Sequence, residues 1–206
     1  MVDVAPGPTI IHGAAPVPSQ PITAERYISA EWLADEFADL WPTQWLFACL
    51  ARDVDAPGKY VVFNLGRESI VVAGTKDGSI AANYNVCQHR GARVMTDERG
   101  CAQALTCPYH GWSYRPDGRL VVVPDNNRFP GGKVDRADRS LKPVRVEVWL
   151  GMVWVAMSEE TPPLRDWLGP VAERLDPFHL DGYTLVGDQT VAVSYTHLTL
   201  PTTPYV

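Results

Sequence analysis

Two short segments of this sequence hold metal-binding residue types at close spacing. The first reads Cys87-Gln-His89-Arg-Gly and the second reads Cys107-Pro-Tyr-His110-Gly-Trp. Each supplies one cysteine and one histidine, and seventeen residues separate His89 from Cys107. Thiolate is a soft ligand and imidazole is the usual neutral nitrogen ligand, so two of each can complete a metal site. The sequence therefore predicts one metal centre built from these four side chains.

The spacing bears on the choice between zinc and an iron–sulfur cluster. Two Cys and two His are also a ligand set of structural zinc. Zinc fingers, however, usually pair Cys with Cys over about two to four residues and His with His over about three to five, whereas each segment here mixes one of each. A mixed segment presents its sulfur and its nitrogen to different metals, as a two-iron cluster with His on one iron requires. The spacing favours a 2Fe-2S cluster, and a zinc-stapled binding domain is the non-redox alternative.

Together the two segments resemble the Rieske 2Fe-2S domain, in the form found in the α subunit of aromatic-ring-hydroxylating (Rieske non-haem iron) oxygenases. The resemblance rests on Cys-x-His-Arg-Gly and Cys-Pro-Tyr-His-Gly-Trp, and it extends over roughly residues 27–190. It implies that Cys87 and Cys107 bind the inner iron of a Rieske-type 2Fe-2S cluster, and that His89 and His110 bind the outer, more exposed iron. It assigns no catalytic residue to this chain.

Two positions distinguish the chain from the Rieske proteins of respiratory chains. Those proteins carry a further Cys in each segment and join the two in a disulfide, whereas the corresponding positions here are Ala92 and Tyr109. The resemblance therefore implies a domain without that disulfide, suited to the cytoplasm. It also implies a reduction potential toward the low end of the Rieske range of about −150 to +300 mV.

The function that the resemblance implies is electron transfer. In the intact family a reductase, a ferredoxin or both deliver electrons from NAD(P)H to the cluster, and the electrons pass to a mononuclear Fe(II) in a neighbouring subunit. Two His and one carboxylate hold that iron. Of the five His of this chain, two are assigned to the cluster, His12 is in the tail, and His179 and His197 are badly placed to supply that set. We therefore expect mononuclear Fe(II) only in the intact parent, a homotrimer, with His110 as the point where electrons leave this domain. A self-contained Rieske ferredoxin-type electron carrier is the alternative.

The rest of the sequence predicts a mainly β fold: a Rieske-type antiparallel β-sandwich with a short N-terminal helix and short C-terminal helices. Glycine permits the positive φ of the hairpin turns expected at residues 76–78 and 115–118. Ser29 is a good N-cap for a helix that Pro42 should end, and short helices are expected at residues 163–168 and 171–175. The strands are predicted at residues 45–51, 60–65, 69–73, 79–84, 103–106, 113–115, 120–122, 144–149 and 152–156.

Composition excludes several classes of protein. The chain has 206 residues, of which 46% are hydrophobic and 20% charged, so it can bury a core. Its longest apolar stretch, residues 148–157, is far shorter than the ~20 residues of a membrane-spanning helix. The net charge of −6 disfavours nucleic acid as a partner. The start of the chain lacks the features of a secretory signal. We expect a cytoplasmic protein with no membrane or nucleic-acid partner.

The chain divides into four parts by composition and resemblance. Residues 1–26 are predicted to be a flexible Pro-rich tail, and residues 27–160 the Rieske domain with its N-terminal helix. Residues 161–192 resemble the start of a catalytic domain that is missing here. Residues 193–206 contain no Asp, Glu, Lys or Arg and resemble a translated sequencing adapter. We therefore expect the native sequence to be interrupted near residue 192.

Overall fold

The computed structural model describes residues 23–124, 126–129, 131, 133–184, 186–187 and 189. The chain divides into two units, Met1–Pro42 and Thr43–Val206, which are described separately below. No helix among the described residues is long and apolar enough to cross a membrane. Residues 1–22, in the predicted tail, and residues 193–206, in the predicted adapter segment, lie outside the described residues.

The described part of the first unit is helical. Helix α1 (Glu25–Ile28) precedes α2 (Ala30–Asp35), which continues through a π-helical turn (Glu36–Leu40). The predicted N-cap is confirmed, because the Ser29 hydroxyl accepts hydrogen bonds from the Glu31 and Trp32 amides at 3.2 and 3.4 Å. The helix ends at Leu40, two residues before the predicted stop at Pro42. Pro42 lies inside a 3-10 turn (Trp41–Thr43). The turn tolerates proline because the amides of its first residues donate no hydrogen bond within the turn.

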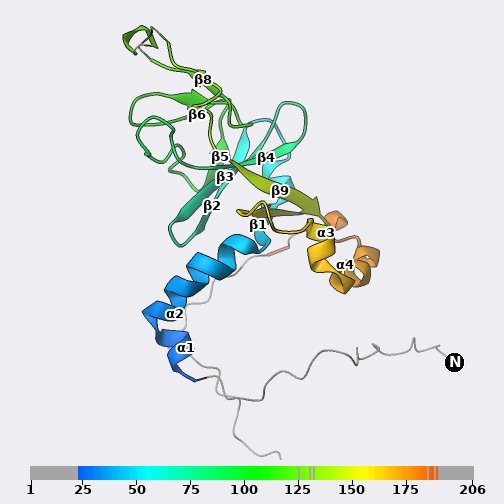
Figure 1. Ribbon diagram of the computed structural model, residues 1–206. Coiled ribbons are helices and arrows are strands. Elements are labelled where there is room, and N and C mark those ends of the chain that lie inside the picture. The colour runs from blue at the N-terminus through cyan, green and yellow to red at the C-terminus, as the bar shows by residue number, and fades with distance from the viewer. Residues whose placement is uncertain are drawn as a thin grey trace, which may run out of the picture. The chain divides into compact units, whose positions relative to one another are not determined.

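The second unit is mainly β, as predicted, and Figure 1 shows its small sheet and helices α3 and α4 at different ends. A seven-stranded antiparallel sheet has the order β1-β10-β9-β4-β3-β2-β5, and a three-stranded sheet has the order β6-β7-β8. The strands are β1 (Leu46–Leu50), β2 (Lys59–Leu65), β3 (Glu68–Gly74), β4 (Ile80–Tyr84), β5 (Arg99–Cys101), β6 (Leu105–Thr106), β7 (Ser113–Tyr114), β8 (Leu120–Val122), β9 (Pro143–Trp149) and β10 (Met152–Ala156).

Both predicted hairpin turns are confirmed. Gly78 and Gly118 adopt φ of +84° and +89°, in the left-handed region that favours glycine. The Gly78 amide donates to the Thr75 carbonyl, and the Gly118 amide donates to the Arg115 carbonyl at 2.9 Å. Gly118 also lies against the buried side chain of Asn83, where a Cβ atom would clash. This turn therefore connects the small sheet to the large one.

Strand β3 separates two hydrophobic cores. Its side chains are buried from Ser69 onward, and because side chains alternate along a strand, they reach opposite faces. Ile70 and Val72 pack in one core with residues of β9 and β10. Val71 and Ala73 pack in the other, which contains Cys87 and Cys107 themselves. The predicted metal ligands therefore belong to a hydrophobic core, which limits their access to water.

The C-terminal helices are short, as expected. Helix α3 (Leu164–Leu168) and helix α4 (Pro170–Leu175) follow β10. Arg165 and Asp176 form an ion pair at 2.6 Å, and the Trp149 indole N–H donates to the same carboxylate at 2.9 Å. The Arg165 hydrogen bond, together with that from Trp149, lowers the pKa of Asp176. These contacts attach the helical segment to the end of β9.

Candidate metal centre

The two predicted segments form two loops with the same backbone closure. In the first loop, residues 85–95, the Cys87 amide donates to the Ala92 carbonyl at 2.8 Å, and the Gly91 amide donates to the Cys87 carbonyl at 2.9 Å. In the second loop, residues 106–113, the Cys107 amide donates to the Trp112 carbonyl at 2.8 Å, and the Gly111 amide donates to the Cys107 carbonyl at 3.0 Å.

Glycine makes this closure available in both loops. Gly91 and Gly111 each stand four residues after the cysteine, and their φ values are +73° and +71°. A residue with a Cβ atom is strained in this region. The spacing of Cys and Gly in the two motifs is therefore the signature of one turn used twice, and the histidine falls inside each turn.

The two cysteines of the motifs are buried side by side. Cys87 and Cys107 are each only 2% exposed and neither forms a disulfide. Burial raises the pKa of the Cys107 thiol, while hydrogen bonds from the Tyr109 and His110 amides oppose this shift by favouring the thiolate. Contact with Cys87 raises the pKa further. The site thus collects two sulfur donors in a dry environment that already contains N–H groups aimed at a thiolate.

Tyr114 places a hydroxyl group against the first cysteine. Its oxygen lies 3.3 Å from the Cys87 sulfur and accepts a hydrogen bond from the Gln88 amide at 3.0 Å. Burial raises the pKa of Tyr114, so the hydroxyl keeps its proton. Because the oxygen already accepts from Gln88, the hydroxyl hydrogen is free to point at the sulfur.

The two histidine rings lie beside each other, with centroids 4.7 Å apart. His89 stacks on Trp112 at 4.9 Å and 6°, and Phe129 meets the His89 ring edge-on at 6.2 Å. His110 is exposed, and its ring is 3.8 Å from that of Tyr109. Burial lowers the pKa of His89, and the nearby His110, Arg90 and Arg139 lower it further. His89 is therefore held neutral, the form that binds a metal.

An orphaned polar atom supports metal binding at this position. The Nδ1 atom of His89 is buried and has no hydrogen-bond partner, and a buried ring nitrogen without a partner is costly unless something else binds it. Two thiols and two imidazoles are the donor set of a Rieske cluster, so the residues present fit such a group. Within the described residues, no group of three or more His, Cys, Asp or Glu side chains is arranged to hold a single metal ion.

The remaining Cys and His residues lie elsewhere. Cys49 is buried in β1, where burial raises the pKa of its thiol to about 12, and Cys101 is exposed in β5. His179 is exposed and follows the 3-10 turn Asp176–Phe178, with φ of +47°. His12 and His197 are outside the described residues. Among the described Cys and His residues, only the four predicted ligands of the motifs therefore come together.

Sequence reasoning missed the residues that hold the first loop in place. Asn85 is fully buried, and its Oδ1 accepts from the Val94 and Met95 amides at 3.1 and 2.8 Å. Its Nδ2 donates to the Met95 carbonyl and to the Ser69 hydroxyl. The sequence offered one signal for this role, which is that Asn85 directly follows the residues of β4. Tyr114 and Phe129 gave no signal, because their partners are distant in sequence.

Comparison with known proteins gives a consistent result. The family described as "Rieske [2Fe-2S] domain" matches residues 44–144. The large oxygenase component of the naphthalene 1,2-dioxygenase system of Pseudomonas putida is 36% identical over 160 residues, which cover 76% of this chain and 36% of that protein. The oxygenase subunit of glycine betaine monooxygenase from Chromohalobacter salexigens is 31% identical over 156 residues, covering 76% and 34%. The chain thus spans about a third of the length of these curated relatives.

Solved structures give the same match. Naphthalene 1,2-dioxygenase with indole bound in the active site superposes with a TM-score of 0.67 at 36% identity, over 71% of this chain and 33% of that one. The quaternary ammonium Rieske monooxygenase CntA in complex with L-carnitine superposes with a TM-score of 0.69 at 28% identity, over 76% and 45%.

Proposed function

Because residues 44–144 belong to the Rieske [2Fe-2S] domain family, we propose that Cys87, His89, Cys107 and His110 hold the Rieske cluster of an electron-transfer domain. The observation that carries this proposal is the pair of equivalent loops, which brings two buried cysteines and two adjacent histidines into one site. When bound, the cluster supplies one-electron redox chemistry at a potential raised by its two neutral imidazole ligands.

The residues around that cluster have different proposed roles. Cys87 and Cys107 supply thiolates from within a hydrophobic core, where water is excluded. Trp112, buried and stacked on His89, keeps that ring in one orientation. His110 is exposed. This exposure supports His110 as the residue through which electrons leave the domain.

We extend the proposal to the intact protein through its relatives, which are oxygenase components. The chain is proposed to be the N-terminal part of a Rieske oxygenase α subunit, with residues 161–192 leading toward a catalytic domain that holds mononuclear Fe(II). A reductase, a ferredoxin or both serve as the electron donor, and the parent assembles as a homotrimer in the cytoplasm. The free state of the described cysteines is consistent with a reducing compartment.

Metal analysis combined with two substitutions tests the ligand assignment. Cluster-loaded protein should be red-brown and contain two iron and two sulfide per chain. His110→Ala should abolish the Rieske electron paramagnetic resonance spectrum, whereas Cys101→Ala should leave it intact, because Cys101 lies in β5 away from the site. Colourless protein containing one zinc per chain would establish the zinc alternative. Loss of the spectrum in Cys101→Ala would overturn the ligand set.

A further inference from the structure

The surroundings of the first loop concentrate positive charge in an otherwise acidic chain. Residues 126–142 contain five Arg or Lys and two Asp, although the chain has a net charge of −6. Arg90 and Arg93 add two positive charges within the first loop itself. The second loop contains no Asp, Glu, Lys or Arg. The two sides of the proposed cluster therefore differ sharply in electrostatic character.

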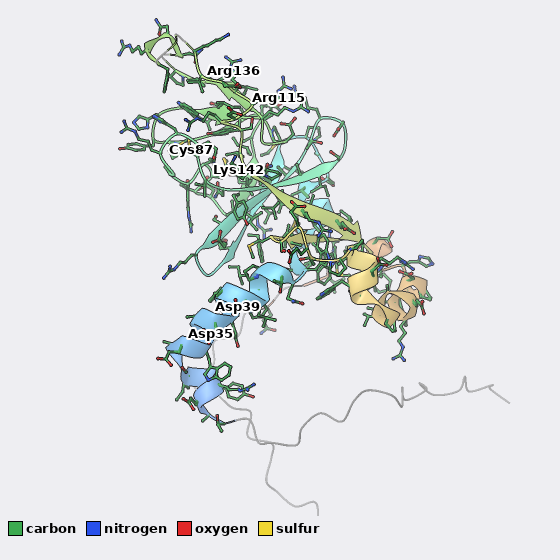
Figure 2. The ribbon with its side chains drawn as sticks, in the orientation of Figure 1. Asp35, Asp39, Cys87, Arg115, Arg136 and Lys142 are labelled. Atoms are coloured by element: carbon green, nitrogen blue, oxygen red, sulfur yellow. The ribbon has the colours of Figure 1, made fainter. Side chains whose placement is uncertain are left out.

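Specific contacts bring the charged segment to His89. The Asn126 side chain accepts from the Val134 amide at 2.9 Å, which closes the segment on itself. Phe129 packs edge-on against His89. The Arg139 guanidinium donates to the carbonyl of Gln88, the residue between Cys87 and His89, at 3.3 Å. Figure 2 shows Arg136 at the end of the second unit that carries β8, above Cys87 in this view.

A cavity of about 340 Å³ opens where the segment meets the first loop. His89, Trp112 and Phe129 form its aromatic side, and Lys133 and Arg139 line it together with Asp135 and Asp138. The charged residues that line a second cavity, of about 620 Å³, are Lys133, Asp135 and Arg136. In the part of the chain that the structure describes, Arg90, Lys133, Arg136 and Arg139 are exposed and form no ion pair with a carboxylate.

We propose that the donor surface, defined as Arg90, Lys133, Arg136 and Arg139 around His89, docks an acidic electron-donor protein. The proposal rests on the proposed function, because it takes His89 as a ligand of the cluster. One electron leaves the reduced donor, which is thereby oxidised, and reduces the cluster that this chain holds. No covalent bond forms or breaks.

Charge complementarity argues for an acidic partner. An acidic protein is repelled by the chain's overall charge and attracted by this one region, so the field orients its approach toward His89. Long exposed Lys and Arg side chains act mainly on such association rates. The exposed His110 belongs to the loop without charged side chains and remains available for the onward transfer. The charged residues thus mark His89, and not His110, as the place where electrons arrive.

Binding and reduction by an acidic protein test the donor surface. The probe is a reduced plant-type 2Fe-2S ferredoxin, an acidic protein whose potential lies below the Rieske range. Its dissociation constant for the cluster-loaded chain is measured by titration calorimetry, and cluster reduction is followed by stopped-flow absorbance. The test variant is Lys133→Glu/Arg136→Glu. The control is Arg67→Glu/Lys76→Glu, which makes the same charge change in the exposed turns next to β3.

We expect the test variant to weaken ferredoxin binding and slow reduction at least tenfold at low salt, and the control by less than twofold. The difference should shrink toward 1 M salt, where the screening length falls to about 3 Å. Reduction by dithionite, a small reductant, should be equal in all three proteins. Equal losses in the test and control variants, or no loss in either, would overturn the docking site alone. Absence of a Rieske spectrum in the unmodified protein would instead overturn the proposed function.

Discussion

The two ligand loops share a backbone turn but differ in almost everything around it. Both are closed by the same two amide–carbonyl bonds and a glycine at positive φ. The first loop is then fixed by buried side chains from outside the turn, and His89 is half-buried in an aromatic setting. The second loop is fixed by its own hydroxyl groups, and its histidine is exposed. The turn positions the proposed ligands, whereas the surroundings give the two histidines different exposure.

The strongest test of this contrast is the removal of one anchor from each loop. Asn85→Ala leaves several buried amide and carbonyl groups of the first loop without partners, and each such group costs about 1–3 kcal/mol. We expect the free energy of unfolding to fall by about 3 kcal/mol and Tm by about 10 °C. The measurement is thermal unfolding of the cluster-loaded protein, followed by circular dichroism.

The matched substitution in the second loop is Ser113→Ala. It removes a hydroxyl that donates to the Gly111 carbonyl and accepts from Thr106, each at 3.0 Å. Ser113 is buried but its partner Thr106 is exposed, so we expect a loss of about 1 kcal/mol. Equal losses for Asn85→Ala and Ser113→Ala would show that the two loops are anchored equally, contrary to the comparison above.

A smaller effect is expected from the hydrogen bond to the first cysteine. Tyr114→Phe removes the hydroxyl next to Cys87. A hydrogen bond to a cluster sulfur stabilises the reduced, more negative state. A bond of about 1 kcal/mol corresponds to a fall in potential of roughly 40 mV. Redox titration of the cluster-loaded protein measures this fall in potential.

Tyr109→Phe is the control for this change, since it removes a hydroxyl in the second loop from an exposed ring. We expect its potential to match that of the unmodified protein. A fall of the same size in Tyr109→Phe, or an unchanged potential in Tyr114→Phe, would show that the tuning does not come from the first loop.

The smallest effect concerns the charge state of His89 in the metal-free protein. Burial lowers the pKa of His89, and Arg139 is among the positive charges that lower it further. Arg139→Gln should therefore move the pKa of His89 back toward its ordinary value, as measured by nuclear magnetic resonance titration of the ring. Arg67→Gln, at a distant turn, should leave the pKa of His89 unchanged. A pKa of His89 that is identical in Arg139→Gln and the unmodified protein would show that this charge does not reach the ring.

The same shift predicts how the stability of the metal-free protein depends on pH. A base whose pKa is lowered by folding binds more protons in the unfolded chain. The contribution of neutral His89 is therefore complete above the ordinary histidine pKa of about 6.5 and is lost as the pH falls toward its lowered pKa in the folded state. Denaturant unfolding between neutral and mildly acidic pH should show a stability that declines with acid. His89→Asn, which cannot titrate, should reduce that decline.

Residue type and spacing determined the turns and which residues we propose as ligands. The predicted bounds of β8 and β10 are exact, and the bounds of the other predicted strands are correct to within two residues at each end. Strand β5 was missed, because Arg99–Cys101 is three residues long, exposed and contains a glycine. Such a segment has no periodicity of its own and becomes a strand only by pairing with β2.

Only the tertiary structure decided how the two halves of the site differ. The motifs of Cys87 and Cys107 share a Cys, a His and a Gly four residues after the Cys, and nothing in either one indicates which histidine is exposed. That difference arises from Tyr114, Phe129 and Arg139, which reach the first loop from a later strand or a later segment. A turn is encoded by local backbone preferences, whereas burial and electrostatic potential are sums over neighbours that only folding brings together.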